Sequence, residues 1–351
     1  MSRRDDLRSL CTDARIGRSH PDPGAADRLW DAALFTPQAN HTTEREDHRR
    51  WRRAVVPRFG APRMEEPRRQ AQELLTQLLD TVTAAGPPTD LHARLAEPFS
   101  ARLNFDVLGI PREDHARMRS WSDDMRAGND RRRAHAAHAA ITAHLDHLLE
   151  RKREQPADDA LSDLVTARDS DGPLTRDQAL EGACHLFFGG YETLAARVSY
   201  GVLALLTHPD QYRALAQQSA PARGAVEEIL RYAVPGGSWI PRYALADINY
   251  HGTHIRAGDL VVFHIQSANR DENAFPGAHL FDITRTPNPH VAFGHGTFHC
   301  IGASLARLAL STLVETLPTR LPQLRLADDP ATLPTDDNKI TGGLLGLPVT
   351  W

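Results

Sequence analysis

One cysteine stands in a stretch whose residue types could support several kinds of chemistry. Residues 291–310 read VAFGHGTFHCIGASLARLAL, with Cys300 directly after His299 and just before a helix-like pattern. A lone cysteine in a protein is commonly a small buried hydrophobic residue. A zinc site would need further ligands at a spacing such as C-x-x-C, and none stands nearby. A nucleophilic cysteine would need a base that the fold brings close, which a sequence cannot display.

The surroundings of Cys300 favour a ligand to a larger cofactor. Gly294, Gly296 and Gly302 allow the backbone to bend sharply and to approach a flat group closely. Backbone N–H groups at the start of the following helix can donate to a thiolate and lower its pKa. With Phe293 behind it, a thiolate at this position suits the axial ligand of a haem iron.

This stretch resembles the haem-binding loop of the cytochromes P450, which reads F-G-x-G-x-H-x-C-x-G and continues x-x-L-A-R. The resemblance implies that haem b is the cofactor and that Cys300 is the axial ligand of its iron. It also implies that other residues of the loop contact the haem. The residues in register are Phe293, Gly294, Gly296, Cys300, Gly302, Leu305, Ala306 and Arg307.

One position of this loop departs from the family pattern. The family has His or Arg two residues before the cysteine, where this chain has Phe298, and the imidazole belongs to His299 instead. Because Phe298 cannot donate to a haem propionate, either His299 reaches that group through an altered loop or the contact is missing. We expect it to be missing, because adjacent loop residues seldom point the same way.

Basic residues elsewhere match the family positions that hold the two haem propionates. The segment HRRWR supplies His48 and Arg52 in the bacterial H-x-x-x-R pattern. Arg242 ends the predicted strand GGSWIPR, and His290 directly precedes the haem loop. The resemblance implies that these side chains neutralise and orient two buried carboxylates.

A second family motif concerns oxygen activation. Residues 189–194, GGYETL, resemble [AG]-G-x-[DE]-T-[ST], with Leu194 in place of the final Thr or Ser. The chemistry requires a kinked helix, which Gly189 and Gly190 permit. It also requires an acid and an alcohol that relay protons, which Glu192 and Thr193 can supply. The expected catalytic residues are therefore Gly189, Glu192 and Thr193.

A third motif is structural. In EILR, Glu228 and Arg231 lie one helical turn apart and can pair. An E-x-x-R by itself is most often an ordinary surface ion pair. In the family it forms a scaffold together with a third arginine, for which Arg285 stands in the expected place.

Periodicity indicates which residues could line a substrate pocket. His185, Phe188 and Glu192 fall on one stripe of the predicted helix, together with Gly189. On the strand that follows residue 237, alternation places Ser238 and Ile240 on the face of Arg242 and turns Trp239 away. The expected pocket residues are His185, Phe188, Ser238, Ile240 and Leu344.

The elements that must position these residues are mainly helical up to residue 232. Helices are predicted over 131–154, from Thr175 to about residue 206 with Gln178 completing a capping box, and over 221–234. Short strands are predicted from residue 239 to about 271 and in the closing pieces LRLA and LLGLPVTW. We expect one domain, 1–351, mainly α with a small β part. Because residues 5–21 resemble the family's second helix, we expect a P450 fold without the first helix and first strands.

Composition excludes several other classes. The chain has 351 residues, 41% hydrophobic and 25% charged, and a formal charge of −4, which gives no sign of nucleic-acid binding. No apolar run approaches the roughly 18 residues that span a membrane. The start has no signal-peptide core, and three scattered cysteines make no disulfide framework, so we expect a cytoplasmic monomer.

The resemblance implies a haem-thiolate monooxygenase that receives electrons from NAD(P)H through a reductase and a ferredoxin. The arginine-rich segment 45–58 offers either a basic docking surface for the ferredoxin or merely a solvated face. SANRDENAF and HVAFGHG resemble actinobacterial P450s that tailor natural products, which predicts hydroxylation of a small, carrier-bound or peptide substrate. Two alternatives remain: oxidative aromatic C–C or C–O coupling in a peptide, and a haem-thiolate protein that binds ligand without turnover.

Overall fold

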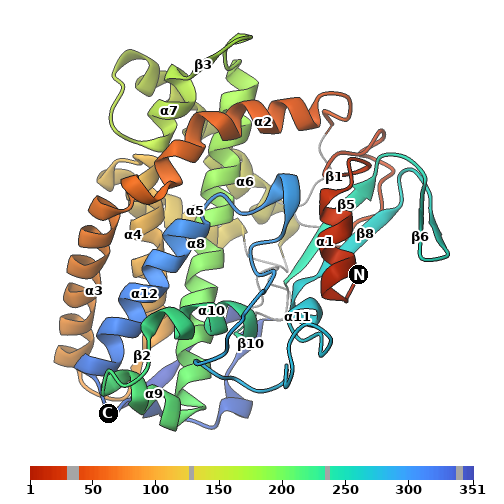
Figure 1. Ribbon diagram of the computed structural model, residues 1–351. Coiled ribbons are helices and arrows are strands. Elements are labelled where there is room, and N and C mark those ends of the chain that lie inside the picture. Colours follow the sequence, from red (N-terminus) through yellow and green to blue (C-terminus); the bar gives the residue numbers. More distant parts are fainter. Residues whose placement is uncertain (30–38, 126–129, 234–237, 337–342) are drawn as a thin grey trace.

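A computed structural model describes residues 1–29, 39–125, 130–233, 238–336 and 343–351 (Figure 1). Helices dominate the described part up to residue 232, as the sequence predicts. The helices are α1 (Arg4–Thr12), α2 (Glu44–Val55), α3 (Glu65–Ala85), α4 (Glu97–Leu108), α5 (His115–Met125), α6 (Arg131–Glu154), α7 (Ala160–Thr166), α8 (Arg176–Leu206), α9 (Pro209–Ala216), α10 (Ala222–Tyr232), α11 (Ile265–Ala268) and α12 (Ala303–Arg320).

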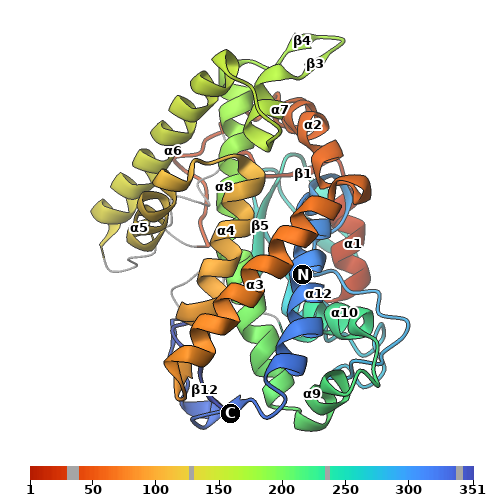
Figure 2. The ribbon, with the colours of Figure 1, turned by 90° about the vertical axis from the view of Figure 1, so that its left-hand side faces the viewer.

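The long helix α8 runs through the middle of the molecule in both views (Figures 1 and 2). Its start confirms the predicted capping box, since the Thr175 hydroxyl accepts from the Gln178 N–H and the Gln178 side chain accepts from the Thr175 N–H. Buried residues occur on every face of α8, which packs against α4, α2, α6 and α10. Its middle is therefore held rigidly, and it can position reacting groups.

The predicted β part forms from short strands, most of them after residue 238. β1, β5 and β8 make an antiparallel sheet in which Ile16 opposes Ala244 and Arg242 opposes Val261. The strands are β1 (Ile16–Gly17), β2 (Thr89–Asp90), β3 (Arg168–Asp169), β4 (Gly172–Pro173), β5 (Trp239–Ala244), β6 (Ile248–Tyr250), β7 (Thr253–Ile255), β8 (Leu260–His264), β9 (Arg325–Leu326), β10 (Thr335–Asp336), β11 (Gly343–Leu344) and β12 (Pro348–Thr350).

Two hydrophobic cores hold the structure together. The larger one joins the helices α2 to α10 and α12, with Phe99, Phe105 and Leu313 fully buried. The smaller one joins α1 to the sheet, where Leu7 of α1 and Phe263 of β8 are buried. Figure 1 shows α1 lying beside β5 and β8, apart from the helical layers. The site lies where these two cores meet.

The buried charges of the E-x-x-R motif form one network. Glu228 and Arg231 have no exposed surface and pair at 2.7 and 2.8 Å, while Arg285 lies 3.4 Å from Glu228. Arg231 also donates to the backbone carbonyls of Asn269, Ala278 and Leu280. The network therefore ties α10 to the irregular segment that leads into the Cys300 loop.

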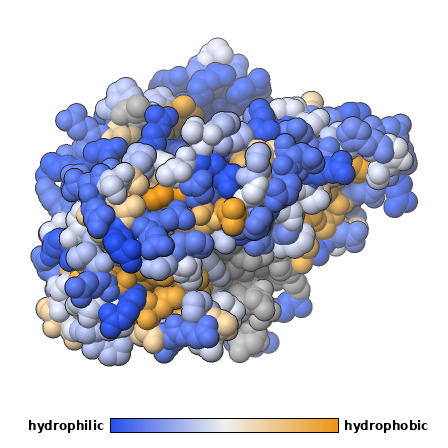
Figure 3. Space-filling model, turned by 60° about the horizontal axis from the view of Figure 1, so that its bottom comes forward, coloured by the Kyte–Doolittle hydropathy of each residue, from blue (hydrophilic) through white to orange (hydrophobic). Residues whose placement is uncertain are grey.

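One face of the molecule resembles the surface of an ordinary globular protein. Figure 3 shows a mostly hydrophilic face on which apolar residues gather in small areas. Among the described residues, no helix is long and apolar enough to cross a membrane.

Glu228→Gln is expected to destabilise the fold by about 3–5 kcal/mol, because it leaves two buried guanidiniums without their carboxylate. Urea unfolding followed by circular dichroism measures the change. The matched control is Glu66→Gln, which breaks an ion pair with Arg69 that is more than half exposed and is worth about 0–1 kcal/mol. Equal unfolding midpoints for E228Q and E66Q would contradict the structural role of the network.

Candidate active site

A cavity of about 370 Å³ opens between the two cores, a size typical of small-molecule and cofactor sites. Leu186, Leu230 and Leu305 line it from the helical core, and Ile16 and Phe263 line it from the smaller core. α2, α8, β5 and the Cys300 loop all contribute to its walls. Its lining is mainly apolar, with a few basic groups that are described below.

The Cys300 loop is shaped by its glycines, as the sequence predicts. Gly294 and Gly296 have positive φ angles of 68° and 70°, which disfavour other residues. A Cβ at Gly296 would lie 2.4 Å from the Cys11 carbonyl oxygen, so only glycine fits the loop against the end of α1. The Cys300 N–H donates to the Phe293 carbonyl at 2.9 Å and closes the loop on itself.

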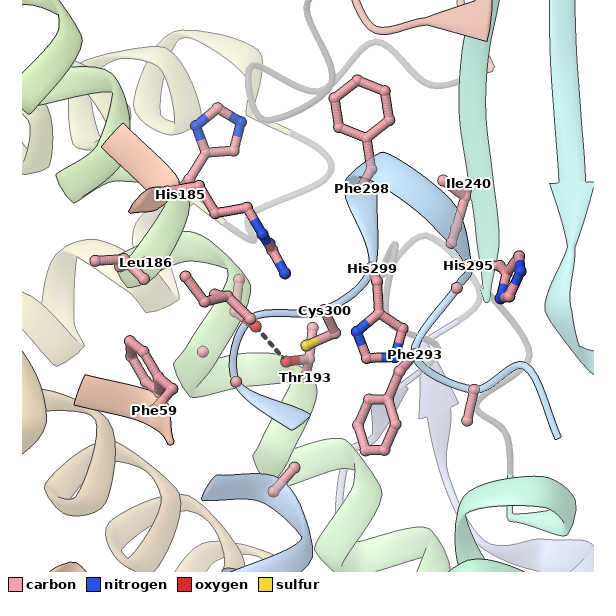
Figure 4. Close-up of a pocket in the computed structure, with 18 of the residues that line it drawn as sticks. Phe59, His185, Leu186, Thr193, Ile240, Phe293, His295, Phe298, His299 and Cys300 are labelled. Carbon is pink, nitrogen blue, oxygen red and sulfur yellow. Dashed lines mark hydrogen bonds between the residues drawn. The ribbon is translucent and has the colours of Figure 1, made fainter. Parts of the chain in front are cut away.

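The Cys300 thiol points into the cavity (Figure 4). The residue is exposed by surface area although it lies deep in the fold, because the exposed surface is cavity wall. Burial raises the pKa of this thiol, and the Gly302 N–H and the charges of Arg52 and Arg307 oppose that rise. Coordination to a metal ion deprotonates a thiol outright.

α8 presents Gly189 and Thr193 to the same cavity. The Thr193 hydroxyl donates to the Gly189 carbonyl at 2.6 Å, one helical turn back. A Cβ at Gly189 would meet no atom within 4 Å, whereas one at Gly190 would clash with Asn104 of α4. α8 continues as one helix through both glycines. Glu192 is half-buried beside Thr193 and does not line the cavity formed by the described residues.

Four guanidiniums line the cavity: those of Arg18, Arg52, Arg197 and Arg242. Within the described part of the chain, none of them has a carboxylate oxygen within 4.0 Å. Burial lowers the pKa of Arg242 to about 10, and burial together with the nearby Arg242 charge lowers that of Arg18 to about 9. Burial also lowers the pKa of Arg52. Such a cluster would be stabilised by anions.

Two histidines of the site are neutral. Burial and the charge of Arg18 lower the pKa of His48 to about 2 and that of His185 to about 3. Trp51 packs between them, stacked on His185 and edge-on to His48. The permanent positive charge of the cavity therefore comes from the guanidiniums.

Phe298 and His299 point to opposite sides of the loop (Figure 4), which agrees with our expectation for adjacent residues. His299 lies 6.2 Å from the Phe293 ring. Phe298 contacts His48, and the guanidiniums of Arg18 and Arg242 lie 4.5 and 5.2 Å from its ring centroid. Sequence reasoning missed Arg18, because it belongs to none of the motifs.

The structure places His290 beside a carboxylate and not in the wall of the cavity formed by the described residues. Its ring nitrogen lies 2.9 Å from a Glu227 carboxylate oxygen. Glu227 also accepts two hydrogen bonds from Arg307, at 2.7 and 3.0 Å. Burial raises the pKa of Glu227, but the His290 and Arg307 bonds outweigh burial and lower it to about 2. The His290 ring is therefore paired with a carboxylate of the protein itself.

The predicted substrate-pocket residues divide into two groups. His185 and Ile240 line the cavity. Phe188, Ser238 and Leu344 do not line it, as far as the described residues define it. Phe188 instead stacks on His138 of α6. Leu344 belongs to the helical core, and the Ser238 carbonyl accepts from Ile265 at the sheet edge.

The arginine-rich segment 45–58 is less available as a docking surface than expected. Arg52 faces the cavity, and Arg45 donates to the Asp13 and Ile16 carbonyls. The acidic segment after α6 folds over the C-terminal end of α2. Arg50 and Arg58 are mostly buried there, in ion pairs with Asp169 and Asp163 respectively. Arg49 and Arg53 remain about 60% exposed.

These features fit an iron porphyrin. The described residues provide a thiol, apolar walls and guanidiniums that lack carboxylate partners, which match the metal, the ring and the two carboxylates of haem. The family model for cytochrome P450 matches residues 32–322, and the chain belongs to this family of haem enzymes.

Within the family, the chain is similar to monooxygenases of secondary metabolism. It is 38% identical to pentalenolactone synthase of Streptomyces exfoliatus and 35% identical to mycinamicin IV hydroxylase/epoxidase of Micromonospora griseorubida. Both alignments cover 100% of this chain and 89% of the relative. The crystal structure of the LnmA hydroxylase from leinamycin biosynthesis in Streptomyces atroolivaceus superposes with a TM-score of 0.89 at 36% identity, covering 100% of this chain and 89% of that one.

Glu181 of α8 gives the stability of the fold a measurable pH dependence. Burial and the charge of Asp47 raise its pKa to about 7, against about 4.3 in an unfolded chain. The folded state therefore binds a proton that the unfolded state releases. This contribution to stability is complete below about pH 4.3 and is lost as the pH rises through about 7.

In Glu181→Gln the side chain is neutral at every pH, so the variant does not lose this contribution to stability as the pH rises. Between about pH 5 and pH 8, the stability of E181Q should rise relative to the wild type by roughly 1–3 kcal/mol, measured by urea unfolding. The control is Glu154→Gln, at the exposed end of α6. Parallel pH curves for E181Q and the wild type would contradict the assignment.

Proposed function

We propose that the protein is a haem-thiolate monooxygenase that hydroxylates a natural-product intermediate, with electrons supplied by a ferredoxin. One observation carries the proposal: the Cys300 thiol and the Thr193 hydroxyl face the same apolar cavity. Haem bound there would supply an iron that binds and activates dioxygen. The relatives named above, a mycinamicin hydroxylase/epoxidase among them, support the substrate class and the type of reaction.

The chain's own groups divide the work between holding the cofactor and moving protons. Cys300 would ligate the iron, and Arg52 and Arg242, with His48 beside them, would face the cofactor's carboxylates. The Thr193 hydroxyl donates a hydrogen bond to the Gly189 carbonyl, so the lone pairs of its oxygen can accept from another group. Leu186, Ile240 and the other apolar walls exclude water and contact the substrate.

Electron delivery by a ferredoxin is proposed from the family alone. The exposed basic groups that α2 still offers are Arg49 and Arg53. A docking surface for an acidic partner would include these two residues rather than the whole segment 45–58.

The axial ligand is tested by spectroscopy. The reduced, haem-loaded wild type should give the strongly red-shifted carbon monoxide spectrum that marks thiolate ligation, and Cys300→Ser should lose it. Cys184→Ser, which alters a half-buried cysteine outside the cavity, should keep it. A wild-type spectrum typical of imidazole ligation would refute the proposal. Product analysis with candidate natural products then tests hydroxylation.

Thr193→Val should lower the rate of product formation by about 10²–10⁴-fold, because it removes a hydroxyl that can hold a proton at the reacting site. Thr193→Ser keeps the hydroxyl and should stay close to the wild type. Both rates are measured by product analysis under saturating reductant. Equal rates for T193V and T193S would show that the hydroxyl carries no proton in the slow step.

A further inference from the structure

Arg18 is held in the cavity by three separate elements. Its backbone N–H donates to Glu44 at 2.7 Å, and the Ser19 N–H donates to the same carboxylate at 3.0 Å. Glu44 is buried at the start of α2, and the four-residue spacing of Glu44, His48 and Arg52 places all three on one helix face. The helix that carries two of the predicted haem-carboxylate contacts thus also fixes the backbone of Arg18.

The guanidinium of Arg18 is anchored on α8. Its Nη1 lies 2.7 Å from His185 Nε2, while His185 Nδ1 lies 2.9 Å from the Glu181 carbonyl. Because arginine can only donate, His185 Nε2 accepts from Arg18 and Nδ1–H donates to Glu181. His185 therefore orients the guanidinium without neutralising it.

Phe298 of the Cys300 loop is the third element. The guanidiniums of Arg18 and Arg242 both lie over its ring, and the His48 ring packs against it at 4.8 Å. An aromatic face attracts cations. At the position where the family has a cation, this chain thus has an aromatic ring, and two cations from other parts of the fold lie against it.

The cations around the cavity favour the binding of carboxylates. Of the four guanidiniums that line it, that of Arg197 donates to the Leu230 and Ala233 carbonyls. Those of Arg18, Arg52 and Arg242 lie close to His48 or Phe298. Haem b carries two carboxylates, which would offset part of this positive charge, and without Arg18 one fewer cation would face them.

We propose that Arg18 supplies the cation toward the haem carboxylates that the Cys300 loop lacks at Phe298, and that the Phe298 ring holds Arg18 and Arg242 in position. The inference rests on the proposed haem-binding function. Arg18 and Phe298 then form one unit: the arginine takes the electrostatic role of the family's His or Arg, and the phenylalanine makes room for it and orients it.

Haem retention tests the proposal without any turnover. The rate at which haem leaves the loaded protein for an excess of an apo-globin acceptor is measured by absorption. Arg18→Gln should speed this loss about 10- to 100-fold, the range for a lost charge-assisted hydrogen bond. Arg18→Lys, which keeps the charge but not the planar fork, should lie between R18Q and the wild type. The matched control Arg15→Gln breaks an exposed pair with Asp13 and should change the rate less than about fivefold.

A second substitution tests the coupling to the loop. Phe298→His restores the family's usual residue and, in the R18Q background, should bring haem retention back to within about threefold of the wild type. Urea unfolding of the cofactor-free variants runs in parallel. A general loosening of the fold would not be repaired by an imidazole at position 298, so failure of F298H to rescue R18Q overturns the proposal whatever the unfolding shows.

Equal rates of haem loss for R18Q and R15Q would also overturn it. If the wild type at the same time shows the thiolate spectrum, the proposed function stands and only the role of Arg18 falls. If the wild type lacks that spectrum, the proposed function itself has failed. The two failures are therefore distinguishable in one set of samples.

Discussion

The burial of positive charge beside a thiol is the constraint on which this site depends. Removing a guanidinium from water costs several kcal/mol unless an anion accompanies it. Arg18, Arg52 and Arg242 are brought to one cavity, and the guanidiniums of Arg18 and Arg242 contact uncharged groups there: an imidazole, a backbone carbonyl and the face of Phe298. Anionic groups bound in the cavity would offset this cost.

The rest of the fold holds these groups in place. Two hydrophobic cores leave a cavity where they meet, and α8 spans it with Thr193 facing the Cys300 loop. The loop itself is held at both ends. The Glu228–Arg231 pair fixes the segment that enters it, and α12 begins directly after it with Gly302 as N-cap. The buried charges of that pair stabilise the fold, whereas the guanidiniums of Arg18, Arg52 and Arg242 face the cavity.

The motifs predicted those site residues that their neighbours in the sequence identify. Cys300, Gly189 and Thr193 follow from short patterns, and all three line the cavity. The pairing of His290 with Glu227 was not predicted, because a position in the chain does not reveal which side chain lies beside it. Phe188 was misplaced because α8 is buried on every face, so helical periodicity alone cannot distinguish the cavity side from the side that packs on α6.

The sequence by itself determined the family, the mainly helical class, the long helix with its capping box and the identity of the cysteine loop. Each of these is encoded in neighbouring residues through spacing, capping and glycine. Only the tertiary structure decided which cations reach the cavity. Arg18 and Phe298 lie 280 positions apart in the chain. They meet because Glu44 of α2 and His185 of α8 hold Arg18 beside the Cys300 loop. Electrostatic complementarity depends on distances in space, which a linear pattern does not contain.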